Sequence, residues 1–325
     1  MPNFPYDQMM TRRALDPNDR LAINAVLVSA RQAIDIICDR WSLTLLLAFM
    51  QGDKRFGDLL ARTGMAGRLL TSRLQVFQEN GVLVRMPYSM HPPRFEYRLT
   101  NMGADAGNIL LHMARWESVW MDQSLSSARF SHISCGSPLA ALVLCRTCGA
   151  ATDARQIDTR VSRAQIQKAP VKLAKHRRSI VHSAVGKPQP LGTTLDIFGD
   201  KWGIEVLICA FFRVHRFGDF RDCIGISANI LSDRLARLVE AGLLTRDNKQ
   251  SPDAGYWLTP MGIDVYPVMV AVHEWADTWV RARYNSPVKL IHRSCGKPFL
   301  PVLGCTNCAE PVSAGNASLS AASTP

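Results

Sequence analysis

The sequence predicts a mainly α-helical fold with small β-hairpins, an α+β arrangement that occurs twice in the chain. A stretch that begins with Arg55-Phe56-Gly57-Asp58 recurs as Arg216-Phe217-Gly218-Asp219, 161 positions later. Matched residues keep this offset up to a predicted hairpin, and those after it lie 159 positions apart. A tolerated change of length marks an exposed loop tip. Each copy therefore has the order helix, helix, hairpin, helix, which is the outline of a winged helix-turn-helix domain.

Composition limits the class of protein. The 325 residues are 47% hydrophobic and 20% charged, as expected for a soluble chain with two domains. Apolar runs stay well short of the roughly 18 residues that a membrane helix needs. We therefore expect a cytoplasmic protein without a membrane partner. The net charge is +11, but nine basic residues and one acid lie between Arg155 and Lys187. The basic balance thus fits a nucleic-acid partner mainly through this stretch.

The duplication divides the chain into six predicted segments. They are repeat 1 (20–125), a Cys/His tail (130–150), a basic linker (151–190), repeat 2 (191–284), a second Cys/His tail (288–312) and a disordered Ser/Ala-rich end (313–325).

Apolar spacing and turn residues predict the elements in order. Repeat 1 should have helices over Ala22–Ile37, Trp41–Met50, Phe56–Arg62 and Arg68–Asn80, then strands Val82–Tyr88 and Phe95–Leu99 around the tip Ser89–Arg94. In repeat 2, Ser227 should cap the matching helix, and strands Leu243–Asp247 and Tyr256–Leu258 should flank the tip Asn248–Gly255. A closing helix follows in each copy, with Trp116 and Trp120 or with Trp275 and Trp279. Trp41, Trp116, Trp202 and Trp275 are predicted core residues.

The second helix of such a motif fits the major groove of DNA, where base edges can be read. The predicted DNA-contacting residues are Arg55, Arg68, Thr71, Ser72, Arg73, Gln75, His91 and Arg94 in repeat 1, and Arg216, Asn229, Ser232, Arg234 and Arg237 in repeat 2. The helix residues would read bases, His91 and Arg94 would act from the wing, and Arg55 and Arg216 would hold phosphates. The alternative is a merely solvated helix face. Asp233 makes repeat 2 the weaker reader.

Six of the nine cysteines belong to a repeated H-x2-C-x9-C-x2-C pattern. Its residues are His132, Cys135, Cys145 and Cys148 in the first tail and His292, Cys295, Cys305 and Cys308 in the second. Three sulfurs and one imidazole in each tail suit a tetrahedral structural zinc site, so we expect up to two zinc ions. A thiol switch or no special role are the alternatives. Cys38, Cys209 and Cys223 are expected to be buried small hydrophobes.

The motifs together resemble the HxlR-type winged helix-turn-helix transcriptional regulators. In repeat 1 the resemblance rests on Trp41, Arg55–Leu59, Leu70–Leu74, Glu79–Leu83, Pro92–Tyr97 and Leu99–Gly103. In repeat 2 it rests on Asp200–Trp202, Arg216–Phe220, Leu231–Leu235, Glu240–Leu244 and Leu258–Gly262. Such proteins are usually single-domain homodimers that bind operator DNA, so the resemblance implies that the tandem copies form a covalent pseudo-dimer.

Three features depart from the family pattern. Repeat 2 has Ser251–Ala254 in place of the Pro-Pro-Arg wing tip. Some relatives sense oxidants through a cysteine about a dozen residues before the first tryptophan, but Val28 and Ser29, or Gln189 and Pro190, occupy that neighbourhood here. The Cys/His tails are the third departure.

We therefore predict a sequence-specific transcriptional regulator that binds double-stranded DNA as an intramolecular pseudo-dimer or a homodimer, with an unknown effector. The alternative is a metal- or thiol-responsive interaction module with only non-specific DNA binding. The sequence does not predict an enzyme, because it has no P-loop, dinucleotide-binding glycine motif or nucleophile elbow.

Overall fold

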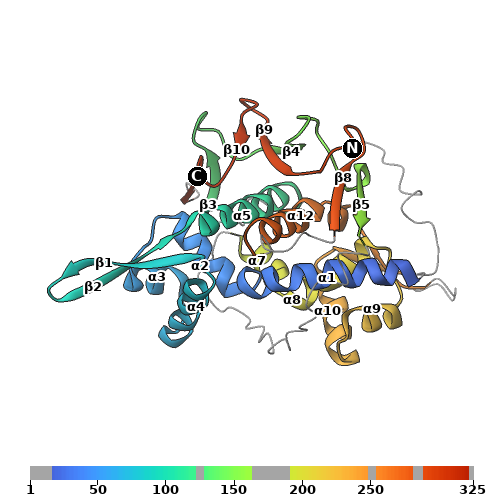
Figure 1. Cartoon of the computed structure of the whole chain (residues 1–325), viewed down its shortest axis with the longest axis horizontal. Coiled ribbons are helices and arrows are strands. Elements are labelled where there is room, and N and C mark those ends of the chain that lie inside the picture. The colour runs from blue at the N-terminus through green and yellow to red at the C-terminus, as the bar shows by residue number, and fades with distance from the viewer. Residues whose placement is uncertain (1–16, 122–127, 163–190, 248–253, 281–287, 322–325) are drawn as a thin grey trace. The chain divides into compact units, whose positions relative to one another are not determined.

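The computed structural model describes residues 17–121, 128–162, 191–247, 254–280 and 288–321 (Figure 1). Most of the predicted basic linker (163–190) and most of the second wing tip (248–253) lie outside the described residues. None of the described helices is long and apolar enough to cross a membrane.

The chain forms two compact units that do not follow the order of the repeats. The smaller unit consists of residues 1–28 and 202–263, and the larger unit consists of residues 29–201 and 264–325. The helix-turn-helix and wing of repeat 2 thus belong to the smaller unit. Repeat 1 from residue 29 on and both Cys/His tails belong to the larger unit.

The smaller unit contains the helix-turn-helix of repeat 2 and the start of the first helix. Its elements are the first part of α1 (Pro17–Ile37), α8 (Lys201–Phe211) from residue 202 on, α9 (Phe217–Ile224), α10 (Ala228–Glu240), β6 (Leu244–Arg246), β7 (Tyr256–Leu258) and α11 (Pro260–Ile263). Gly225 ends α9 with φ of +78°, a left-handed conformation that glycine adopts without strain. The apolar face of α10, with Leu231, Leu235 and Leu238, is buried. Arg20 in α1 donates to Asp219 in α9 at 2.8 Å.

The larger unit contains the matching elements of repeat 1 and the closing helices of both repeats. Its helices and wing are the rest of α1, α2 (Arg40–Met50), α3 (Phe56–Thr63), α4 (Gly67–Glu79), β1 (Leu83–Met90), β2 (Pro93–Leu99), α5 (Asn101–Trp120), α7 (Gly192–Phe198), α12 (Tyr266–Trp275) and the π-helical turn η4 (Ala276–Val280). Helix α2 is buried on almost all sides because its sequence is apolar all round. Asp39 caps α2 by accepting from the backbone N–H groups of Trp41 and Ser42.

A repeated threonine and glycine fix the start of each closing helix. Thr100 Oγ1 accepts from the backbone N–H of Gly103 and donates to the carbonyl of Gly81, which precedes the wing. A Cβ on Gly103 would lie 2.1 Å from the carbonyl oxygen of Val82, so only glycine fits. In the smaller unit, Thr259 and Gly262 make the same contacts. This close approach explains the recurrence of the Leu-Thr-x-Met-Gly motif in both copies.

The closing helices α5 and α12 contact each other in the larger unit (Figure 1). Trp120 donates from Nε1 to Asp264 at 2.7 Å, and Trp279 donates from Nε1 to Asp105 at 2.8 Å. Trp279 and Asp264 are the repeat 2 equivalents of Trp120 and Asp105, 159 positions later. A residue of each copy therefore makes the same contact with the other copy, as in an isologous dimer interface.

The two Cys/His tails form one set of small antiparallel sheets, which we call the Cys/His module. Its elements are β3 (Ala128–His132), β4 (Ala141–Cys145), the 3₁₀ turn η3 (Ala154–Gln156), β5 (Ile157–Val161), β8 (Val288–His292), β9 (Pro301–Cys305), β10 (Pro311–Val312) and β11 (Ala317–Ala321). Strand β4 pairs with β9, β3 with β11, and β5 with β8, so each pair joins one tail to the other.

The module has an approximate two-fold relation. Strands β8, β9 and β11 repeat β3, β4 and β5 at an offset of 160 positions. The equivalent residues Val143 and Leu303 lie directly opposite each other in the β4–β9 pair. Exchanging the two tails therefore leaves the strand pairing unchanged. In the larger unit, β4, β9 and β10 lie over α5 and α12 (Figure 1).

Several predicted segments need correction. Within the segment predicted to be disordered over 313–325, residues 317–321 form β11 and pair with β3. The predicted linker 151–190 begins with η3 and β5, because the main chain of Ile157–Val161 pairs with β8. Trp116 and Trp275 are core residues as predicted, but Trp41 and Trp202 are only half-buried. Cys38, Cys209 and Cys223 are buried, as expected.

Candidate DNA-binding interface and metal centres

Helix α4 presents a polar face to solvent. It follows α3 after a turn in which Gly64 adopts φ of +65°, and its apolar residues Leu70, Leu74 and Phe77 are buried. The exposed residues of its first three turns include the predicted readers Arg68, Thr71, Ser72 and Gln75. Two of these make only local contacts, since Thr71 donates to the carbonyl of Gly67 and Gln75 donates to Glu79. These side chains are therefore accessible to a partner.

Arg73 differs from its predicted role. Its Nη1 lies 3.1 Å from Asp39 Oδ2, and about a quarter of its side chain is exposed. Because Asp39 also caps α2, this ion pair fixes α4 against α2. Arg73 thus helps to position the helix, and its contact with DNA stays a prediction.

The wing of repeat 1 is a long exposed hairpin. Strands β1 and β2 pair from Leu83 opposite Leu99 to Met90 opposite Pro93, and the tip carries His91 and Arg94, both exposed. The Arg55 guanidinium, at the N-cap of α3, lies over the Tyr88 ring at 4.4 Å. The predicted phosphate contact and the wing therefore lie beside each other.

Sequence reasoning missed Arg85 in the same hairpin. Its guanidinium lies 3.6 Å from the centre of the Phe95 ring, and the residue is exposed. Its place on β1, six residues before His91 at the tip, is the signal that could have identified it as a further cation on the wing.

In repeat 2, the exposed face of α10 is less basic than its sequence suggested. Asn229, Ser232 and Arg237 are exposed as predicted. Asp233 accepts from Arg237 at 3.0 Å and also pairs with Arg234. Arg234 is only 7% exposed, because its position in the helix faces the core. In this structure the Arg234 side chain is therefore little accessible to DNA, and its contact with DNA stays a prediction.

The described strands of the repeat 2 wing are shorter than those of repeat 1. They are three residues each, and the His215 ring stacks on the Trp257 ring at 4.3 Å. Arg216, the predicted phosphate contact, is exposed at the N-cap of α9.

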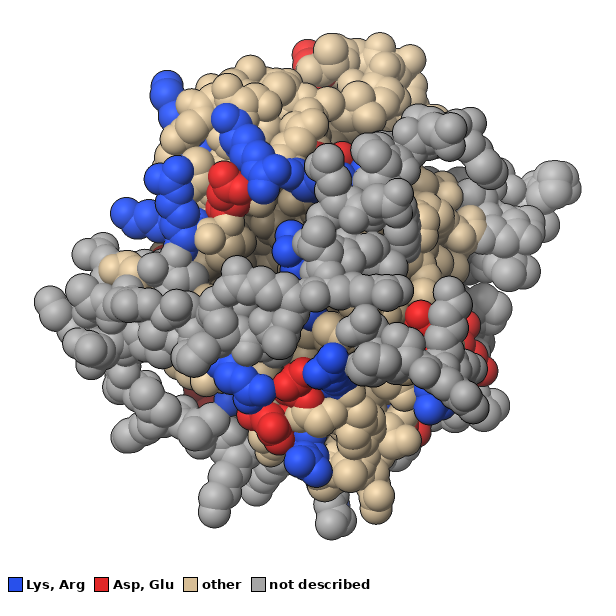
Figure 2. All heavy atoms as spheres, turned by 90° about the vertical axis from the view of Figure 1, so that its right-hand side faces the viewer, with Lys and Arg blue, Asp and Glu red and all other residues tan. Residues whose placement is uncertain are grey.

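Figure 2 shows one face of the molecule with its charged residues coloured. Among the described residues of this face, lysine and arginine lie beside aspartate and glutamate, so the face has mixed charge.

The eight predicted metal ligands form two clusters, but with different partners from those predicted. One cluster contains His132, Cys135, Cys305 and Cys308, and the other contains Cys145, Cys148, His292 and Cys295. In each cluster the four ligand atoms lie within 4.8 Å of one another. The grouping of four ligands within one tail is therefore corrected: each cluster takes two residues from each tail.

Each ligand pair lies in the same type of turn. The main-chain N–H four residues after the first ligand bonds back to that ligand's carbonyl, at 2.8 Å for His132, Cys145 and His292 and 3.0 Å for Cys305. The residue at the end of each turn has positive φ and is Gly136, Gly149, Gly296 or Ala309. The Ser137 backbone N–H lowers the pKa of the Cys135 thiol to about 6, which favours the thiolate that binds metal.

The surroundings of the two histidines differ. His132 and His292 are fully buried. His292 Nε2 lies 3.4 Å from Gln156 Oε1, whereas His132 Nε2 has no hydrogen-bond partner among the described residues. A metal-bound histidine usually donates its other ring N–H to such an acceptor.

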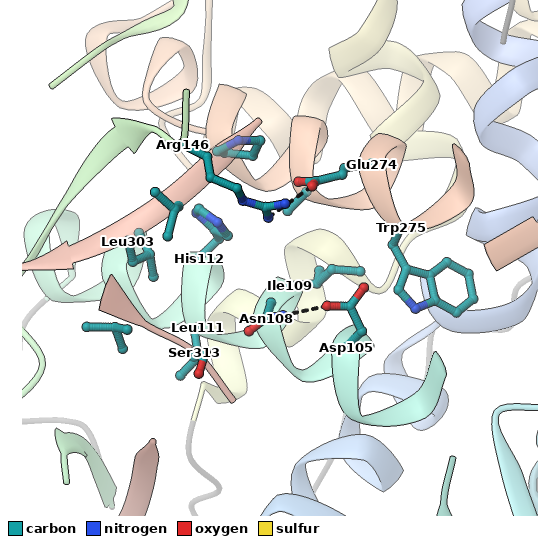
Figure 3. A pocket seen from close by; sticks show the side chains of 14 residues that line it. Asp105, Asn108, Ile109, Leu111, His112, Arg146, Glu274, Trp275, Leu303 and Ser313 are labelled. Carbon is teal, nitrogen blue, oxygen red and sulfur yellow. Dashed lines mark hydrogen bonds and ion pairs between the residues drawn. The ribbon is translucent and has the colours of Figure 1, made fainter. Parts of the chain in front are cut away.

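A small pocket lies in the larger unit between α5, α12, β9, β10 and the turn after β4 (Figure 3). Its volume is about 100 Å³. Arg146 and Glu274 form an ion pair of 3.1 Å in its lining, and Asn108 donates to Asp105 at 2.8 Å (Figure 3). Sites for drug-sized ligands have about 300–1,000 Å³. We therefore assign no effector to this pocket.

Comparisons with known proteins agree with the helix-turn-helix geometry. A family model for the HxlR-like helix-turn-helix matches residues 36–125 and 197–284. An uncharacterized HTH-type transcriptional regulator of Mycobacterium tuberculosis strain H37Rv is 37% identical over 130 residues, which are 39% of this chain and 82% of that protein. The uncharacterized HTH-type transcriptional regulator YtfH of Escherichia coli K12 is 31% identical over 88 residues, covering 27% of this chain and 70% of that protein.

Among solved structures, a proposed transcription factor from Pseudomonas aeruginosa is 25% identical and covers 43% of this chain and 99% of that chain, with a TM-score of 0.34. A TM-score this low does not support any inference about fold or function from this structure.

Proposed function

The chain belongs to the HxlR-like helix-turn-helix family, and from this premise we propose that it is a DNA-binding transcriptional regulator whose two linked repeats read one operator as a pseudo-dimer. The observation that carries the proposal is the solvent-exposed polar face of α4, with Arg68 and Gln75 on it. The names of the relatives, which are HTH-type transcriptional regulators, support the same function.

In this proposal α4 enters the major groove. Arg68 and Gln75 are long enough to make two-point contacts with base edges, and Thr71 and Ser72 add single hydrogen bonds. Arg55 and Arg94 neutralise phosphates beside the groove, which sets the register of the helix without reading sequence.

The two repeats should read unequal half-sites. The α10 face offers Asn229, Ser232 and Arg237, and the Asp233 carboxylate that pairs with Arg237 opposes a close approach to phosphate. A pseudo-two-fold arrangement would place the half-sites roughly 34 Å apart. The reciprocal contacts of Trp120 and Trp279 support an arrangement of this symmetry.

The test is selection of bound fragments from genomic DNA by the purified full-length chain. We expect enrichment of an imperfect inverted repeat with one strong and one weak half-site. Binding that depends only on salt concentration, with no enriched sequence, would replace the proposal with the alternative of a metal- or thiol-responsive interaction module. A second chain bound per operator would indicate a homodimer in place of the intramolecular pseudo-dimer. The proposal places the protein in the cytoplasm and assigns it no catalytic activity.

We also propose that zinc is the structural cofactor of the two Cys/His clusters. Three thiolates and one imidazole are the donor set of many closed, tetrahedral zinc sites. Metal analysis of protein purified without chelator should give two zinc ions per chain. A metal-free preparation that keeps its fold would reject zinc and leave the thiol-switch alternative.

A further inference from the structure

The two Cys/His tails carry an unusual arrangement of ligands. We infer that they form one composite zinc module, in which each of two sites takes a His-x2-Cys pair from one tail and a Cys-x2-Cys pair from the other. This inference rests on the zinc binding proposed above and goes beyond it, because it assigns the ligands of each site and makes neither tail sufficient alone.

The spacing of the ligand atoms fits a tetrahedral zinc ion. With zinc–sulfur bonds of about 2.3 Å and zinc–nitrogen bonds of about 2.0–2.1 Å, tetrahedral geometry places two sulfurs about 3.8 Å apart and a sulfur and a nitrogen about 3.5 Å apart. In the first cluster, Cys135 and Cys305 have their sulfurs 3.8 Å apart. His132 Nδ1 lies 3.6 Å from the sulfur of Cys135 and 3.3 Å from that of Cys308.

The second cluster repeats this geometry. His292 Nδ1 lies 3.5 Å from the sulfur of Cys295, in its own tail, and 3.4 Å from the sulfur of Cys148, in the other tail. A disulfide would place two sulfurs at about 2.0 Å, and all nine cysteines are free thiols. The distances therefore match a shared metal ion and exclude a disulfide framework in this structure.

The backbone explains why the sites are shared. Strand β4 ends at Cys145 and pairs with β9, which ends at Cys305, in antiparallel register. The turn after each strand is consequently carried to the opposite end of the pair. There it meets the His-x2-Cys turn of the other tail. Strands β3 and β8 end at the two histidines, and β3 is held by pairing with β11 and β8 by pairing with β5. Because the two tails are related by an approximate two-fold axis, the same arrangement of turns occurs twice and forms both sites.

Shared ligands couple metal binding to the association of the repeats. Cys135 and Cys305 are 170 positions apart, so a zinc ion bound to both closes a long loop of the chain. Metal binding then contributes its free energy to the association of the two tails. Zinc would in this way maintain the intramolecular pairing of the two repeats, in addition to the peptide linker.

The decisive experiment compares two double variants that remove the same number of ligands. Cys135→Ser with Cys308→Ser removes two ligands of one shared site, and Cys135→Ser with Cys148→Ser removes one ligand from each site. At low free zinc buffered by a chelator, the first variant should keep one zinc per chain and the second should keep none. Ligand sets confined to one tail require the opposite result, one zinc for the second variant and none for the first, which would overturn the inference.

A measurement on the wild-type chain avoids any variant that fails to fold. After zinc removal, mild oxidation with diamide converts two neighbouring thiols into a disulfide, while diamide takes up the two electrons and two protons. Mass spectrometry of the digested protein should identify a bridge between Cys135 and Cys305. A bridge from Cys135 to Cys145 or to Cys148, which belong to the same tail but to the other shared site, would contradict the shared sites.

The outcomes separate the two proposals. Wild-type protein without zinc would reject the cofactor itself, and two bound zinc ions with the reversed pattern in the double variants would reject only the sharing. Neither outcome depends on operator binding.

Discussion

Trp120 hydrogen-bonds to Asp264 across the two closing helices, from Nε1 to Oδ2 at 2.7 Å. The equivalent pair, Trp279 and Asp105, makes the same contact in the reverse direction at 2.8 Å. The two closing helices thus contact each other reciprocally, in the way that the subunits of a symmetric dimer do. The Cys/His module repeats this reciprocity with its strands and its ligand clusters.

The two aspartates that accept these hydrogen bonds should contribute unequally to the stability of the protein. Asp264 also accepts from the charged Arg115 at 2.5 Å, whereas the second donor to Asp105 is the neutral Asn108 amide at 2.8 Å. Asp264→Ala should therefore lower the free energy of unfolding by about 2–3 kcal/mol and Asp105→Ala by about 1 kcal/mol. Denaturant unfolding of the two variants measures the difference. Equal losses would show that the Arg115 contact contributes no more than the Asn108 contact.

Arg68 and Arg73 lie five residues apart on α4 but should respond differently to substitution. Arg68→Ala should weaken operator binding about 10-fold to 100-fold without changing stability, because the exposed guanidinium is a candidate base contact. Arg73→Ala should lower stability, because it leaves the Asp39 carboxylate without its ion pair. Operator titrations and thermal unfolding of both variants provide the measurement, and Gln78→Ala, exposed on the same helix, is the matched control. Unchanged affinity in Arg68→Ala would remove α4 as the reader.

Arg94 should act through charge alone. Arg94→Ala at the tip of the wing should reduce affinity about equally for operator and unrelated DNA, and the slope of log affinity against log salt should fall by about one. Fluorescence titrations over a range of salt concentrations test this expectation. A loss confined to the operator would assign base reading to the wing.

Three of the four turns that carry the Cys/His clusters end in a glycine, and the fourth ends in Ala309. Its φ of +60° is a left-handed conformation that strains an alanine by about 1–2 kcal/mol. Ala309→Gly should therefore raise stability by about 1 kcal/mol. Gly149→Ala, which places the same strain in an equivalent turn with open space around the new Cβ, should lower it by a similar amount. Both changes can be followed by the midpoint of thermal unfolding at saturating zinc, and shifts of the same sign would contradict this account.

His112 should make stability fall in acid. Burial lowers its pKa from 6.5 to about 3, and the positive charge of Arg115 acts in the same direction. Below pH 6.5 the unfolded chain binds a proton that the folded chain does not bind. The contribution is therefore fully present above pH 6.5 and is lost as pH falls toward 3, by about 1.4 kcal/mol for each pH unit.

The comparison of wild type with His112→Gln cancels the acid effects that the two proteins share. In urea unfolding at pH 7.5 and pH 5.5, the wild type should lose about 1 kcal/mol more than the variant. Identical losses would mean that His112 takes up a proton in the folded state.

Most of the local structure could be predicted from the sequence. Turn glycines, apolar spacing and capping residues act over a few positions, so the helices α2 to α4, the wing of repeat 1 and both sets of ligand turns follow from the local pattern. The exposed face of α4 could be predicted for the same reason. The ion pair of Arg73 and the burial of Arg234 could not be predicted, because they depend on how the helix packs, which a helical pattern does not specify.

The sequence by itself determined that the chain is a duplicated winged helix-turn-helix protein with two repeated Cys/His patterns. Only the tertiary structure decided which ligands share a site. Two identical patterns in one chain can be satisfied equally well within a tail or between tails, since ligand type and spacing are the same in both cases. The antiparallel pairing of β4 with β9 resolves this choice, because it carries Cys145 toward His292 and Cys305 toward His132.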